Sequence, residues 1–106
     1  MTDDLVRVEL EEDLQGARLS GELDLAAYEK VQSALAPLFD ASGEVIVDCS
    51  GLSFIDSSGI RLFIRLHRAL GDRGQLVLQA PQPHVVRVLE IAGLSQLGIR
   101  VEGAQG

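Results

Sequence analysis

The chain is poor in aromatic residues and has a single cysteine. It contains no tryptophan, one tyrosine and three phenylalanines among 106 residues. With so few aromatic side chains, a buried core must be built mainly from leucine, valine, isoleucine and alanine. The only cysteine, Cys49, cannot form a disulfide within the chain, which favours a reducing compartment such as the cytoplasm.

Segments that direct a chain to a membrane are missing too. The acidic start MTDDLVRVEL has neither the basic residues nor the apolar stretch of a signal peptide. No apolar run approaches the ~20 residues that a membrane helix needs. We therefore expect a soluble, cytoplasmic protein.

Basic residues are outnumbered. Nine Lys and Arg stand against 16 Asp and Glu, giving a formal net charge of −7. Such a chain is repelled by nucleic acid and by anionic lipid, so we expect neither as a partner. His67 and His84 have no Cys, Asp or Glu at metal-ligand spacing, so no metal or other cofactor is expected.

Hydrophobic residues are plentiful, at 46% of the chain. That content and a length of 106 residues predict one compact domain over residues 1–106. We expect its core within about residues 5–101 and a frayed tail over residues 102–106. The sequence does not determine the oligomeric state.

The first half predicts a hairpin, a helix and a strand. LVRVEL and ARLSGEL alternate in polarity around the polar turn EEDLQG, as antiparallel hairpins do. Asp24 is placed as the N-cap of a helix that ends around Ala36, before Pro37. EVIVDCS then predicts a strand covered on both faces. The helix that follows Asp24 carries an apolar stripe formed by Leu25, Tyr28, Val31, Leu35 and Leu38.

The second half predicts two helices and two strands. IRLFIRLHRAL and PQPHVVRVLEIAG have helical spacing, with Pro83 at the first helical position and Gly93 as the stop. RGQLVLQA and LGIRV read as strands, the latter with Leu97, Ile99 and Val101 on one side. The order β-β-α-β-α-β-α-β predicts an α/β fold with one mixed sheet. The apolar face of the last helix is Val85, Val88, Leu89 and Ala92.

The segment SFIDSSGIRLF joins a strand to a helix with an unusual group of small polar residues. A helix that begins near Ser57 needs one cap, and Gly59 in its first turn costs roughly 1 kcal/mol against alanine. Glycine permits a close approach to the backbone, and a helix N-terminus suits an added anion such as a phosphate on serine. The alternative is plain capping by one Ser or Asp of this string, because such strings occur by chance at helix starts.

Three stretches together resemble the STAS family and, within it, the bacterial anti-sigma factor antagonists. They are LSGELDLAAYEKV, VIVDCSGLSFIDSSGIRLFIRLHRAL and VVRVLEIAGLSQLGIRV, within roughly Leu5 to Val101. GELD and F-x-D-S-S-G are the most specific pieces. The resemblance implies phosphorylation at Ser57, supported by Asp56, Ser58 and Gly59. It also implies that Asp24 belongs to the partner-facing surface, and we expect Glu22 and Arg61 to contact the partner with it.

The resemblance further implies partner switching by a protein that is not an enzyme. The unphosphorylated protein would bind an anti-sigma factor that is a serine kinase, and so release a sigma factor. Phosphorylation of Ser57 would end the complex, and a serine phosphatase would reset the cycle. An alternative is a STAS scaffold, or an accessory subunit of a transporter or stress-signalling complex, whose Ser57 is never phosphorylated. A nucleotide-hydrolysing enzyme is disfavoured because no phosphate-binding loop is present.

Two features depart from the family pattern. The family usually has a final helix after the last strand, which the residues VEGAQG do not predict. Family members often have a small residue where this chain has Arg61. Arg61, Arg65 and Arg68 form a basic stripe that reads either as a solvated helix face or, for Arg61, as a group that steadies a phosphate on Ser57. We expect Cys49 to be inert in the core. Asp48, at the end of its strand, either borders a site or organises the following loop by a hydrogen bond.

Overall fold

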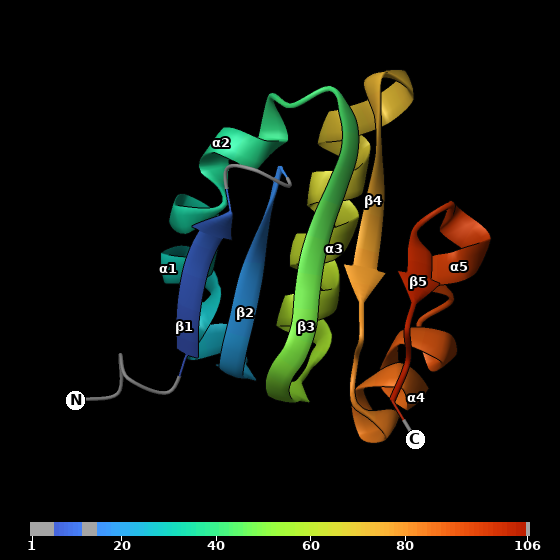
Figure 1. Cartoon of the computed structure of the whole chain (residues 1–106). Helices are drawn as coiled ribbons and strands as arrows, with labels where there is room; N and C mark the ends of the chain where they lie inside the picture. The colour runs from blue at the N-terminus through green and yellow to red at the C-terminus, as the bar shows by residue number, and fades with distance from the viewer. Residues whose placement is uncertain (1–5, 12–14, 106) are drawn as a thin grey trace.

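In the computed structural model, residues 6–11 and 15–105 are described, and they form one five-stranded sheet with α-helices (Figure 1). The strands are β1 (Val6–Glu11), β2 (Gly16–Leu23), β3 (Gly43–Ile55), β4 (Gly74–Gln79) and β5 (Arg100–Glu102). The α-helices are α1 (Tyr28–Ala34), α2 (Ala36–Phe39), α3 (Ser57–Leu70), α4 (Pro83–Ile91) and α5 (Leu94–Leu97). Within the described residues, 3-10 turns cover Leu25–Ala27 and Gly71–Arg73.

The strands lie in the sheet in the order in which they occur in the chain. β1 and β2 are antiparallel, and every later neighbouring pair is parallel. Helices α1, α2 and α3 lie on one side of the sheet (Figure 1). The predicted α/β fold with a mixed sheet and an N-terminal hairpin is therefore confirmed, although Leu5 and residues 12–14 of the predicted hairpin lie outside the described residues.

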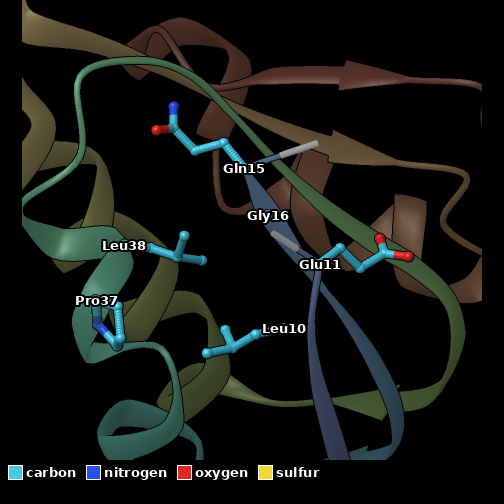
Figure 2. A pocket seen from close by; sticks show the side chains of 6 residues that line it. All are labelled: Leu10, Glu11, Gln15, Gly16, Pro37 and Leu38. Carbon is cyan, nitrogen blue, oxygen red and sulfur yellow. The ribbon is translucent and has the colours of Figure 1, made fainter. Parts of the chain in front are cut away.

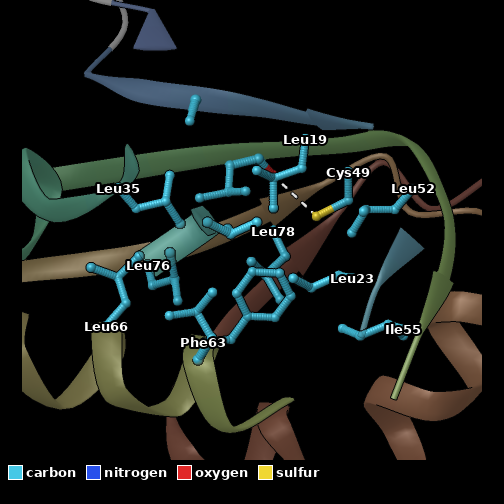
Figure 3. Close-up of a cluster of buried hydrophobic side chains, with 14 of the residues drawn as sticks. Leu19, Leu23, Leu35, Cys49, Leu52, Ile55, Phe63, Leu66, Leu76 and Leu78 are labelled. Carbon is cyan, nitrogen blue, oxygen red and sulfur yellow. Dashed lines mark hydrogen bonds between the residues drawn. The ribbon is translucent and has the colours of Figure 1, made fainter. Parts of the chain in front are cut away.

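The core is almost entirely aliphatic, and the sheet, these three helices, α4 and α5 all contribute buried side chains to it (Figure 3). Phe63 of α3 is fully buried among leucines that β2 and β4 contribute. Cys49 is also fully buried, and its Sγ contacts the carbonyl oxygen of Val47 at 3.5 Å. Burial raises the pKa of the Cys49 thiol to about 12, so it stays protonated and unreactive, as the sequence predicted.

Strand β3 differs from its prediction in length and in burial. It continues to Ile55 instead of ending near Ser50, because its second half pairs with the end of β2 across register shifts. Val45 and Val47 are fully buried, whereas Ile46 and Asp48 between them remain partly exposed. The expectation of a strand covered on both faces is therefore wrong, since β3 buries one face fully and the other only in part.

The predicted helix over residues 24–36 is divided into three pieces. Asp24 is an N-cap as expected, but it caps the 3-10 turn Leu25–Ala27 that precedes α1. Because a 3-10 turn has about three residues per turn, the apolar stripe changes phase there, and Leu25 is 71% exposed rather than buried. Pro37 lies in the first turn of α2 instead of ending the helix.

The end of the chain also departs from its prediction. α4 begins at Pro83 as expected, and Gly93 adopts a left-handed conformation with φ 74° after it. The additional helix α5 ends at Leu97, the first residue of the predicted strand LGIRV, so Leu97 is exposed and β5 begins only at Arg100. After β5, the backbone N–H of Gln105 donates to the carbonyl oxygen of Pro81 at 2.9 Å, in the segment that follows β4.

Candidate functional site

The carboxyl ends of β2 and β3 lie side by side and carry two aspartates. Leu23 and Ile55 are register partners, and the backbone N–H of Asp56 donates to the carbonyl oxygen of Leu23 at 3.3 Å. Asp24 and Asp56 follow these partners directly. Each accepts a backbone N–H with its Oδ1, Asp24 from Ala27 at 3.1 Å and Asp56 from Ser58 at 2.8 Å. One edge of the sheet thus holds two capping carboxylates together.

The two adjacent serines have different environments. Ser57 is the first residue of α3 and is exposed, whereas Ser58 is only 6% exposed. Ser58 does not act as the cap that the sequence allowed, since its backbone N–H is the group that Asp56 caps. A hydroxyl must be accessible to react with another protein. At this junction Ser57 is accessible, whereas Ser58 is buried.

Gly59 is buried and serves packing within the chain. A methyl group added at its Cα would lie 2.6 Å from Cγ1 of Ile55 and 2.8 Å from Cγ of Leu23. The first turn of α3 therefore rests directly on the ends of β2 and β3. The interpretation that glycine opens the backbone to another molecule is wrong, because residues of the same chain fill that space.

An apolar hollow of about 260 Å³ lies beside the exposed serine. Its lining is formed by the start of α3 and one side of α4: Ser57, Ile60, Val88, Ile91 and Ala92. Ile91 is 81% exposed, and Ala92 is also exposed, although the sequence placed Ala92 on the buried face of its helix. The sequence pattern did not predict this surface, and the available signal was Ile91, an apolar residue outside the predicted apolar face.

Glu22 and Arg61, the other predicted site residues, lie near this edge on different elements. Glu22 is one residue before Leu23 in β2 and is paired in register with Phe54, which is 44% exposed. Arg61 is exposed on α3, four residues after Ser57. Among the described residues, Arg61 forms neither a hydrogen bond nor an ion pair.

A second hollow lies at the opposite end of β2 (Figure 2). Its volume is about 330 Å³, and Leu10, Gly16 and Leu38 are among the residues that line it. Leu10 is 46% exposed there. None of the predicted site residues lines this hollow.

The remaining polar candidates have structural roles. Asp48 accepts the backbone N–H of Ser50 at 2.9 Å and lies 3.4 Å from Arg18. Burial opposes the charged form of Asp48, but the hydrogen bonds from Ser50 and the charge of Arg18 outweigh it and lower the pKa of the carboxyl. The ring Nε2 of His84 donates to the carbonyl of Ser53 and joins α4 to β3.

Across residues 6–11 and 15–105, no three His, Cys, Asp or Glu side chains are grouped so that they could hold a metal ion. Within the same residues, no helix is long and apolar enough to cross a membrane.

Comparison with known proteins assigns the fold to a family. The family model of the STAS domain matches residues 8–102, so the chain belongs to the STAS domain family. A relative from Lysinibacillus sphaericus, named an anti-sigma F factor antagonist, is 35% identical over 80 residues, which are 73% of this chain and 68% of the relative. The resemblance predicted from the GELD and DSSG segments is confirmed.

Solved structures agree with this assignment. An anti-sigma factor antagonist from Mycobacterium paratuberculosis superimposes with a TM-score of 0.76 at 20% identity, over 93% of this chain and 86% of that one. The Bacillus cell fate determinant SpoIIAA in its phosphorylated form gives a TM-score of 0.64 at 26% identity, over 91% of this chain and 89% of that one.

Proposed function

We propose that this chain is an anti-sigma factor antagonist that is switched by phosphorylation of Ser57. Unphosphorylated, it binds an anti-sigma factor that is also a serine kinase, and thereby frees a sigma factor. The kinase transfers the γ-phosphoryl group of ATP to Oγ of Ser57, which loses its proton, and ADP is formed. A serine phosphatase then removes the phosphate. The name of the Lysinibacillus sphaericus relative supports antagonism of an anti-sigma factor, and the phosphorylated form of SpoIIAA supports control by phosphorylation.

The observation that carries the proposal is the contrast between the two serines. Ser57 is exposed at the start of α3, whereas Ser58 is 6% exposed and its backbone N–H is held by Asp56. A kinase must bring its nucleotide to the hydroxyl oxygen, so burial disfavours Ser58 as a substrate. Of the two serines in the DSSG segment, the accessible one, Ser57, is also the one whose phosphorylation the family resemblance implies.

Charge explains how a phosphate on Ser57 would weaken a complex. A phosphoserine adds about −1.5 to −2 charges at neutral pH. Here the charge would appear at an edge that already carries Asp24 and Asp56, on a chain with a net charge of −7. Like charges brought together in an interface cost several kcal/mol, and about 1.4 kcal/mol is tenfold in affinity. The switch therefore requires no refolding.

The hollow beside Ser57 supports a second contribution to release. Its other lining residues, Ile60, Val88, Ile91 and Ala92, are apolar, so an apolar side chain of the partner would bury surface there. Once Ser57 is phosphorylated, closing the same contact would remove water from a charged phosphate, which is strongly unfavourable. Charge repulsion and desolvation would then act in the same direction.

The proposal is tested by mixing the purified protein with ATP and the serine-kinase anti-sigma factor of the same cell, and locating phosphate by mass spectrometry. We expect one phosphoryl group on Ser57 and loss of the complex. Ser57→Ala should stay bound and unphosphorylated, whereas Ser57→Asp should bind at least about tenfold more weakly.

Ser33→Ala is the matched control, because Ser33 is exposed on α1 and should not alter phosphorylation or binding. A stable complex without phosphate would contradict the switch and favour a STAS scaffold. Phosphate on another serine, with normal binding of both Ser57 variants, would show that the site is misassigned.

A further inference from the structure

The basic side chain nearest in sequence to Ser57 on its own helix is Arg61. Both residues are exposed and belong to α3, which is regular from Ser57 to Leu70. Residues four apart lie above one another on one side of a helix, with their Cβ atoms about 5–6 Å apart. A long guanidinium side chain at position 61 therefore reaches the space occupied by a group attached to Ser57.

Arg61 has no partner within the described residues, in contrast to several other arginines of the chain. Arg18 lies near Glu11 and Asp48, and Arg100 pairs with Glu44 and Glu102. On α3 itself, Arg65 donates to the hydroxyl of Tyr28 at 3.2 Å. Within the part of the chain that the structure describes, Arg61 thus forms no ion pair, although the sequence has 16 acidic residues and only nine basic ones.

Three carboxylates lie near this edge, and two of them are already engaged as caps. Asp56 caps α3 and Asp24 caps the turn before α1, while Glu22 lies on β2 before them. The backbone N–H of Ser58 is occupied by Asp56, so a phosphate on Ser57 would have to displace that cap to bind it. On the side of α4, the residues that line the hollow beside Ser57 are all apolar: Val88, Ile91 and Ala92.

We propose that Arg61 is the internal counter-ion of phosphorylated Ser57. The guanidinium has a planar set of N–H donors that suits two phosphate oxygens at once. The pair would draw the phosphate along the exposed side of α3, away from Asp24 and Asp56. This inference rests on the proposed function only in taking Ser57 as the residue that carries the phosphate.

The pair has a measurable consequence for the phosphate itself. A nearby positive charge favours the doubly ionised form and so lowers the second pKa of the phosphoserine, which is about 6 without a partner. Phosphoserine can be incorporated at position 57 during translation, so no kinase is needed. The second ionisation is then followed by ³¹P NMR at about 0.15 M salt, where distant surface charges are largely screened.

We expect the midpoint of this ionisation to rise by roughly 0.3–0.7 pH units in Arg61→Gln relative to the unchanged chain. The matched control is Arg65→Gln, which removes the same charge one turn farther along α3 and should shift the midpoint far less. Arg61→Lys should retain part of the effect, because lysine keeps the charge without the planar set of donors.

Equal shifts in Arg61→Gln and Arg65→Gln, or no shift in either, would overturn the inference. That outcome would leave the proposed function intact, since the phosphate was not introduced by the kinase. Conversely, a kinase that fails to phosphorylate Ser57 would contradict the proposed function without affecting this titration. Far-ultraviolet circular dichroism of each variant would verify that α3 is retained.

Discussion

At the scale of single residues, Gly59 shows how a motif residue can be required by the fold. Its Cα lies against Ile55 and Leu23, so a larger residue at the start of α3 would push the helix away from the sheet edge. Ser57 and Asp56 keep their geometry only while that contact holds, because both belong to the same turn. The glycine therefore positions the candidate site indirectly.

Gly59→Ala should destabilise the protein in spite of the better helix propensity of alanine. The propensity gain is about 1 kcal/mol, whereas overpacking a tight contact costs typically about 1–3 kcal/mol, and the added methyl would approach Ile55 to 2.6 Å. We expect a lower free energy of unfolding in urea. Ser57→Ala, at an exposed position of the same turn, should change it by no more than about 0.5 kcal/mol. A Gly59→Ala protein as stable as the original would contradict this packing argument.

At the scale of secondary-structure elements, the site depends on two parallel strands that end in register. Leu23 pairs with Ile55, so the aspartates that follow them lie together and cap the turns after both strands. The start of α3 is therefore fixed both by its own cap and by the neighbouring strand. An N-cap side chain is worth about 1 kcal/mol at such a position.

Asp56→Ala should lower the free energy of unfolding by about 0.5–2 kcal/mol, because the N–H of Ser58 loses its acceptor. Asp56→Asn is the matched variant, since asparagine caps about as well as aspartate but carries no charge. We expect thermal denaturation to give Asp56→Asn a midpoint temperature near that of the original protein, and Asp56→Ala a clearly lower one. If both variants lose the same stability, the charge of Asp56 rather than its capping bond is what matters.

At the scale of the whole molecule, the two ends of the sheet differ in what they expose. At the end with Ser57, the exposed Ile91 lies beside one apolar hollow. At the opposite end, Leu10 lines a second hollow. Only the first hollow adjoins the predicted phosphorylation site. A partner that responds to phosphate on Ser57 must contact that end.

Ile91→Ser should weaken binding to the serine-kinase anti-sigma factor by about tenfold or more, since a buried isoleucine contributes roughly 1.5–3 kcal/mol. Its effect on stability should be small, because the side chain is 81% exposed in the free protein. Isothermal titration calorimetry gives the affinity, and Leu10→Ser provides a control at the opposite end. Unchanged affinity for Ile91→Ser would exclude this side of α4 from the interface.

The sequence predicted most elements but not all of their ends. The hairpin, the start of α3 at Ser57, β4 and the start of α4 at Pro83 follow from alternation, helical spacing and capping residues. The second half of β3 was missed because its Ser and Gly residues resemble a loop, and only pairing with β2 makes them a strand. α5 was missed because four residues are too short for a helical period.

The sequence by itself determined the family, the α/β order and the identity of the DSSG segment, because local patterns and motif spacing are properties of the chain alone. Only the tertiary structure decided which serine is accessible, why Gly59 is required and which apolar residues stay exposed. Those properties depend on how Leu23, Ile55 and α4 pack around the start of α3. Burial is a relation between segments distant in sequence, so no local pattern encodes it.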